Sequence, residues 1–254
     1  MTTPAERFAA ARVRQRHAHL AEFEGELAFA LDPFQREACE AVAEGHSVLV
    51  AAPTGAGKTL VGEYAVRHAF RQGEKSFYTT PIKALSNQKF HDLQRAYGPD
   101  NVGLLTGDTT VNPDADIVVM TTEVLRNMIY AGSDTLDRLG VVVLDEVHYL
   151  ADRFRGSVWE EVIIHLHERT AVIALSATVS NAEEFGAWLT EVRGDTRVVV
   201  SEHRPVPLWP HVLLREGMYD LYAPGVDPQD PGPTPRLNPE LEAVAKRSRH
   251  DDGH

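Results

Sequence analysis

The sequence predicts an α/β protein built around a doubly wound, mostly parallel sheet. Short apolar runs alternate with helix-like segments between residues 34 and 200, which is the pattern of repeated strand and helix units. A glycine-rich stretch at residues 52–59 joins one apolar run directly to the next helix-like segment. Four consecutive aliphatic residues at 141–144 predict a strand buried on both faces, as strands of parallel sheets are.

Strands and helices are expected to alternate along the chain. The first helix begins after Asp32, a favourable capping residue, with Pro33 at the first helical position. Ser180 and Glu183 form a capping box that starts the last one. Apolar runs give the expected strands at 47–52, 75–79, 102–105, 117–121, 141–145, 171–176 and 197–200. The expected helices lie at 34–44, 58–71, 82–97, 122–130, 157–168 and 181–190.

The two ends of the chain differ from this pattern. Residues 1–24 are rich in Arg and Ala and predict a helical extension, which either docks on the domain or stays loose. Five prolines and two glycines between residues 223 and 236 predict an exposed linker, followed by a short terminal helix. We therefore expect an extension at 1–24, one α/β domain at 25–200, a connector at 201–222 and the linker with its helix at 223–254.

The stretch at 52–59 predicts a phosphate-binding loop. Gly55 and Gly57 allow the backbone to turn successive N–H groups towards phosphate oxygens, Lys58 adds a positive charge, and the Thr59 hydroxyl suits a bridging Mg²⁺. Ala52 stands where the first glycine of the usual pattern would be. The expected binding residues for a nucleoside triphosphate are Pro53, Thr54, Gly55, Ala56, Gly57, Lys58 and Thr59. The alternative is a glycine-rich turn that binds nothing.

The strand at 141–145 ends in a pair of carboxylates, Asp145 and Glu146. Ligands of open α/β sheets bind at the carboxyl ends of the strands, so this pair is expected opposite the phosphate loop. Asp145 is expected to hold Mg²⁺ through water, and Glu146 to deprotonate the water that attacks the γ-phosphate. Taken alone, such a pair is also consistent with a solvated strand end.

These motifs occur in an order that resembles the superfamily-two DExH-box RNA helicases, and within them the superkiller, or Ski-like, type. Segments at 155–161, 176–188 and 203–208 point to that branch, and the actinobacterial members are the most similar. The similarity covers residues 25 to about 215. The motifs that carry it are Phe29 with 31–35, then 52–59, 79–85, 106–108, 121–126, 145–148 and 176–178.

The resemblance implies a RecA-like domain that forms the first half of an ATP-driven motor on RNA. Phe29 would stack on adenine and Gln35 would read its edge, although Gln35 also suits the capping box of its own helix. The expected contacts to single-stranded RNA, or to DNA, are Thr80, Pro81, Gly107, Thr121 and Thr122, whose threonines equally suit turns and helix caps. The expected residues that couple the two sites are His148, Ser176 and Thr178.

Composition sets limits on this interpretation. The net charge of −12 and the pI near 5.4 argue against an ordinary basic nucleic-acid binder, so we expect weak strand binding through backbone groups and hydroxyls. The single cysteine, Cys39, excludes a disulfide framework, and no apolar run approaches membrane-spanning length. We expect a cytoplasmic protein without a membrane partner.

Two classes of function stay open at this point. One is the ATP-binding module of an RNA helicase, whose second RecA-like domain would supply the arginines that complete the site, or of a DNA-directed helicase of the same superfamily. The other is a nucleotide-dependent RNA-binding or regulatory module that never turns over.

Overall fold

The computed structural model describes residues 3, 18–147, 156–177, 182–206, 208–214, 217–228, 232–241 and 243. The chain divides into two compact units, Met1–His203 and Arg204–His254. The predicted coupling residues His148 and Thr178 lie outside the described residues. Within the described part of the chain, no helix combines the length and apolar character needed to cross a bilayer.

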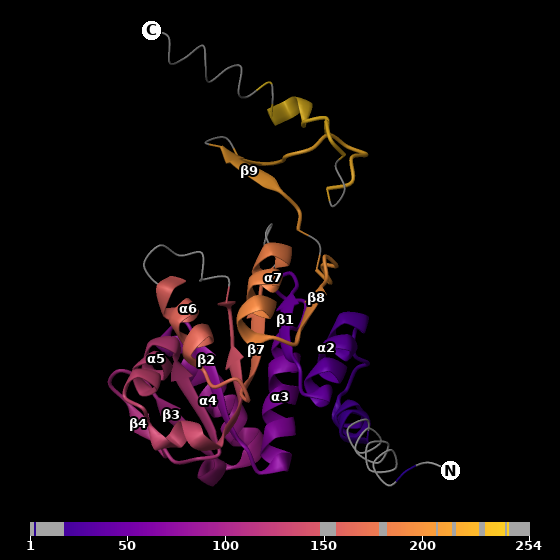
Figure 1. The fold of residues 1–254 in the computed structure, drawn as a ribbon. Helices are drawn as coiled ribbons and strands as arrows, with labels where there is room; N and C mark the ends of the chain where they lie inside the picture. Colours follow the sequence, from indigo (N-terminus) through magenta and orange to yellow (C-terminus); the bar gives the residue numbers. More distant parts are fainter. Residues whose placement is uncertain are drawn as a thin grey trace. The chain divides into compact units, whose positions relative to one another are not determined.

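The first unit is built on an eight-stranded sheet with the order β4-β3-β5-β2-β6-β7-β1-β8 (Figure 1). Every neighbouring pair is parallel except β3 and β4, which run antiparallel at one edge. The strands are β1 Ser47–Ala51, β2 Lys75–Thr80, β3 Val102–Leu105, β4 Thr110–Val111, β5 Ile117–Thr121, β6 Leu139–Leu144, β7 Ala171–Ser176 and β8 Thr196–Val200.

Helices cover both faces of this sheet, so the predicted doubly wound architecture is confirmed (Figure 1). The helices are α2 Pro33–Glu44, α3 Thr59–Gln72, α4 Lys83–Tyr97, α5 Thr122–Tyr130, α6 Gly156–His165 and α7 Ala182–Arg193, with short 3-10 turns at Pro99–Asn101 and Asp134–Arg138. One core lies between the sheet and α2, α3 and α4, and includes the fully buried Cys39. The other core lies between the sheet and α5, α6 and α7.

A helix at residues 18–26 packs against the first of these cores. Leu20 and Phe23 are 3% and 7% exposed and belong to the same apolar cluster as Tyr64 of α3. The open question about the N-terminal extension is thus settled for these residues: they are docked on the domain. Burial of the two apolar side chains accounts for the docking of these residues.

The second unit contains an antiparallel hairpin that the sequence did not predict. Its strands are β9 His211–Leu214 and β10 Gly217–Asp220. The chain then returns: the N–H of Ala223 donates to the carbonyl of Arg236 at 2.9 Å, and Tyr222 bridges to Leu237. The two ends of the proline-rich stretch that we expected as an exposed linker, Ala223 and Arg236, are thus hydrogen-bonded to each other. A cavity of about 440 Å³ is lined by the start of this stretch and by residues of the hairpin.

Candidate nucleotide-binding site

The phosphate loop connects β1 to α3, and its two glycines are needed for different reasons. Gly55 and Gly57 have φ of +85° and +84°, a region that residues with a side chain rarely adopt. A Cβ at Gly57 would also lie 2.6 Å from Nε2 of Gln35, whereas a Cβ at Gly55 would meet nothing within 4 Å. The backbone conformation alone requires glycine at 55, and close packing requires it in addition at 57.

Lys58 is held inside the loop rather than at its surface. Lys58 is only 7% exposed, and its Nζ donates to the carbonyls of Ala52 at 2.8 Å and Pro53 at 3.1 Å. Burial lowers the pKa of Lys58, and the charges of Glu146 and Asp145 act in the opposite direction. The ammonium group therefore lies in the field of the acidic pair, where the sequence predicts the phosphates to bind.

Both polar atoms of the Gln35 side-chain amide form hydrogen bonds within the protein. Its Oε1 accepts from the backbone N–H of Asp32 at 2.9 Å, which is the capping-box contact. Its Nε2 donates to the carbonyls of Gly57 at 3.1 Å and Ala56 at 3.3 Å, so it also fastens the phosphate loop to α2. Phe29 is 58% exposed. The adenine contacts of Phe29 and Gln35 stay predictions, and the capping role that we weighed against them is present.

The acidic pair follows β6, two strands from the phosphate loop. The N–H of Asp145 donates to the carbonyl of Thr79 at 3.0 Å, which continues the pairing of β6 with β2. Burial raises the pKa of Asp145 above its ordinary value, the hydroxyl of Tyr78 opposes this rise, and the charge of Glu146 adds to it. Glu146 has φ of +58°, an unfavourable backbone conformation for a residue with a side chain, of the kind that is often found at functional sites.

Tyr78 is a site residue that the sequence reasoning missed. Its hydroxyl donates to Oδ2 of Asp145 at 2.9 Å, and Nζ of Lys89 lies 5.2 Å from the centre of its ring. Lys89 in turn pairs with Glu63 at 3.0 Å. A polar-tipped aromatic residue near the end of a predicted buried strand is the signal that could have found it, because such a hydroxyl needs a partner.

Ser176 ends β7, the strand between β1 and β6. It is buried, and its carbonyl accepts from the N–H of Ala52 at 3.1 Å, where the phosphate loop begins. A main-chain hydrogen bond thus connects this predicted coupling residue to the loop.

The predicted nucleic-acid residues follow three neighbouring strands, β3, β5 and β2, at the same edge of the sheet as the phosphate loop. Gly107 is exposed and Thr121 half-buried, whereas Pro81 is buried. Thr80 and Thr122 are each 1% exposed, and the Thr80 hydroxyl is engaged by the carbonyl of Ile82 at 3.1 Å and by Ser86 at 2.7 Å. The turn role that we weighed for Thr80 is therefore present, while nucleic-acid contact stays a prediction.

Two residues at the carboxyl edge of the sheet have side-chain oxygen atoms that suit a metal ion. The Thr59 hydroxyl is at the first turn of α3 and the Asp145 carboxylate at the end of β6. Among the described residues no three His, Cys, Asp or Glu side chains cluster as a complete metal site. Two protein ligands completed by water and phosphate oxygens are the usual arrangement for Mg²⁺.

A glycine-rich loop with a buried lysine, facing an acidic pair across the carboxyl edge of a doubly wound sheet, defines a P-loop nucleotide-binding domain. A DEAD/DEAH box helicase family model matches residues 32–185. "Probable helicase HelY" of Mycobacterium tuberculosis is 64% identical over 205 residues, which are 81% of this chain and 23% of that protein. "Antiviral helicase SKI2" of Saccharomyces cerevisiae is 51% identical over 181 residues, 71% of this chain and 14% of that protein.

The chain therefore belongs to the DEAD/DEAH box helicase family, as a helicase ATP-binding domain of the kind found in HelY- and Ski2-like helicases. This confirms the resemblance to Ski-like DExH-box helicases. The chain spans less than a quarter of the length of the curated HelY relatives that it matches. A solved structure of "DUF1998 helicase MrfA bound to DNA" has the same fold, with a TM-score of 0.59 at 24% identity over 72% of this chain and 29% of that one.

Proposed function

We propose that this chain is the first motor domain of an ATP-dependent RNA helicase, and that it binds Mg-ATP between the phosphate loop and the acidic pair. The observation that carries the proposal is Lys58: a buried ammonium group within the loop, under the influence of Asp145 and Glu146. In this arrangement Lys58 neutralises the β- and γ-phosphates, Thr59 and Asp145 hold Mg²⁺, and Glu146 receives the proton of the attacking water.

Titration of ATP into a Lys58→Ala variant tests the nucleotide site. We expect the affinity to fall by about tenfold to a hundredfold, since a charge-assisted contact to phosphate is lost. Lys75→Ala is a matched control, because Lys75 is also a buried lysine but lies at the amino end of β2, at the opposite edge of the sheet. Unchanged ATP affinity in a folded Lys58→Ala variant would show that the nucleotide binds elsewhere.

The choice of RNA rests on relatives whose names state it. "ATP-dependent RNA helicase mtr4" of Schizosaccharomyces pombe is 48% identical over 190 residues. We propose that the exposed Gly107 and the half-buried Thr121 contact the sugar-phosphate backbone, because their loops follow adjacent strands. Single-stranded RNA and DNA of one sequence, titrated side by side, test this choice. Equal or tighter binding of DNA would replace the RNA assignment by a DNA-directed one.

A further inference from the structure

The helix at residues 18–26 is attached to the two helices that carry the nucleotide-binding residues. Its apolar anchors are Leu20 and Phe23, and the Phe23 ring lies 5.2 Å from that of Tyr64 on α3. On a second side, Glu24 forms an ion pair with Arg36 of α2 at 2.8 Å. The helix thus contacts both α2, which contains Gln35, and α3, which begins at the phosphate loop.

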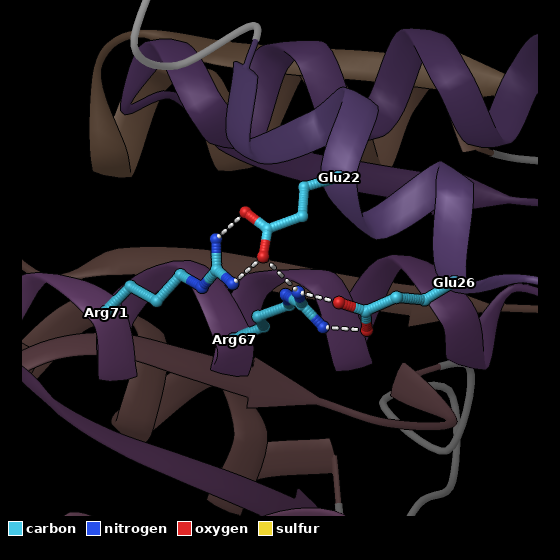
Figure 2. A network of polar contacts seen from close by, with 4 residues as sticks. All are labelled: Glu22, Glu26, Arg67 and Arg71. Atoms are coloured by element: carbon cyan, nitrogen blue, oxygen red, sulfur yellow. Dashed lines mark hydrogen bonds and ion pairs between the residues drawn. The ribbon is translucent and has the colours of Figure 1, made fainter.

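An ion-pair network completes the attachment (Figure 2). Both carboxylate oxygens of Glu26 accept from Arg67 at 2.5 Å, and both of Glu22 accept from Arg71 at 2.5 Å. Arg67 also lies 3.5 Å from Glu22, so the two pairs form one network. The hydrogen bond from Arg71 lowers the pKa of Glu22 to about 2, so this carboxylate stays charged in acidic solution where an ordinary Glu would be protonated. Two-point contacts of this kind fix the rotation of the helix as well as its position.

Phe29, the predicted adenine-stacking residue, follows the network residue Glu26 by three positions in the sequence. Glu26 is the last residue of the helix, Leu27 packs against the core, and Phe29 follows with most of its surface exposed. Asp32 then caps α2, and its backbone N–H donates to Oε1 of Gln35 in the capping box. Phe29 is therefore held in a short connection between two fixed points, and its placement relative to Gln35 depends on the docking of the helix.

We propose that helix 18–26 is a positioning element of the nucleotide site, which holds Phe29 for the adenine base through the Glu22, Glu26, Arg67 and Arg71 network. This rests on the proposed binding of ATP. A ring already held in place costs less ordering on binding, so docking raises the affinity for the base-bearing nucleotide. It does not act on the phosphates, because the Gln35 amide fastens the loop to α2 and the network residues Arg67 and Arg71 lie more than two turns into α3 from the loop.

Charge reversal tests the proposal without touching the apolar anchors. Glu22→Arg with Glu26→Arg, and separately Arg67→Glu with Arg71→Glu, place like charges across the interface. Each pair should raise the dissociation constant for ATP about threefold to tenfold as the docked population falls, and leave that for inorganic tripolyphosphate unchanged. The four substitutions together restore the opposite charges and should restore ATP affinity.

Two controls make the outcome decisive. Asp100→Arg with Asp114→Arg applies the same change in net charge as the first pair, at exposed residues far from the network in sequence, and should leave ATP affinity unaltered. A chain that begins at Leu27 removes the helix outright, which covers the case in which Leu20 and Phe23 keep the reversed helix docked. It should bind ATP more weakly and tripolyphosphate as well as the parent chain does.

The inference is overturned if the chain beginning at Leu27 binds ATP as tightly as the parent chain. It is also overturned if ATP and tripolyphosphate lose affinity equally, since the helix would then support the fold rather than the base site. Failure of the four-residue swap to restore an affinity lost in both reversals would exclude the network as the cause. Full ATP affinity in Lys58→Ala would instead refute the proposed function, so the two failures are distinguishable.

Discussion

At the scale of single residues, the phosphate loop shows a dependence that its motif does not reveal. Gln35, 22 residues before Gly57 in the chain, donates to the Gly57 carbonyl and leaves no space for a Cβ there. The loop is therefore shaped by α2 as well as by its own glycines. Substitutions at its two left-handed positions should have unequal effects.

Gly57→Ala should destabilise the domain more than Gly55→Ala does. Both replacements place alanine in the left-handed region at a cost of about 1–2 kcal/mol, and only the first also displaces the Gln35 amide. Thermal unfolding of the two variants gives the comparison. Equal melting temperatures would show that Gln35 moves aside without cost, and that its hydrogen bonds to the loop contribute little.

Glu146→Gln should retain ATP and lose hydrolysis by about a hundredfold or more, because the amide keeps the shape of the carboxylate and lacks its basicity. The positive φ of residue 146 is equally unfavourable for Glu and for Gln, so the melting temperature of the variant should equal that of the parent chain. Phosphate release, measured with the second RecA-like domain supplied, checks the rate. Glu160→Gln, at an exposed position on α6, is the control. Wild-type turnover in Glu146→Gln would place the base on another residue.

The sequence was enough to predict most residues of the candidate site, because their chemistry is encoded locally. Lys58, Thr59 and the acidic pair follow from a strand that ends in the right residue types. The hydrogen bond from Tyr78 to Asp145 joins residues 67 positions apart, and it follows only from the pairing of β2 with β6. The positive φ of Glu146 is likewise imposed by the surrounding fold and has no signature in the residue type.

At the scale of elements, one arginine joins three of them. The Arg193 guanidinium, at the end of α7, donates to the carbonyls of Leu166 at 2.6 Å, His167 at 2.8 Å and Thr170 at 2.8 Å. These carbonyls lie in the connection from α6 to β7. The guanidinium also donates to the carbonyl of Ile163 at 3.4 Å, in the last turn of α6, where helix carbonyls have no partner within the helix. Arg193 thus connects α7 by hydrogen bonds to the chain segment between α6 and β7.

Arg193→Lys should lower the stability of the domain by about 1–3 kcal/mol, because one ammonium group cannot reach all these carbonyls in the planar arrangement of a guanidinium. Chemical denaturation measures the change. Arg197→Lys, at an exposed position on β8, should change stability little and serves as the control. An equal effect of the two substitutions would mean that water replaces Arg193 at the carbonyls without loss.

Prediction of elements succeeded where they are long and buried, and failed where they are short. Strands β1 and β6 were expected because continuous apolar runs mark them. Strand β4 has two exposed residues, too few for any periodicity to be seen. Strands β9 and β10 have four residues each, pair with each other and lie beside a proline-rich stretch, so no long apolar run marks either of them.

At the scale of the whole molecule, the nucleotide loops and the predicted nucleic-acid loops share the carboxyl edge of one sheet. The two groups meet at β6 and β2, where the Asp145 N–H donates to the Thr79 carbonyl one residue before Thr80. One main-chain hydrogen bond thus connects the acidic pair to the strand that ends at Thr80. With a net charge of −12, the chain as a whole supplies no large basic field for the nucleic-acid contact that we propose at this edge.

A polypeptide of residues 1–254 should bind ATP, hydrolyse it slowly and show little stimulation by RNA. In related phosphoryl-transfer enzymes an arginine from a partner element contributes about a thousandfold or more to turnover. We expect that arginine on a second RecA-like domain. Phosphate release with and without single-stranded RNA, on this polypeptide and on one extended by that domain, checks the prediction. Robust RNA-stimulated turnover by residues 1–254 would require an arginine within this sequence, and equally slow turnover by the extended chain would favour a regulatory module.

The site residues lie at the carboxyl ends of the strands, so a label can be attached at the amino ends without contacting them. Cys39 is completely buried and its burial raises the pKa of its thiol, so it reacts poorly with thiol reagents. A cysteine introduced at the exposed Asp114, in the turn that enters β5, would therefore be the one reactive thiol among the described residues. A dye or surface tether attached there would report on ATP and RNA binding without removing the native cysteine or approaching the phosphate loop.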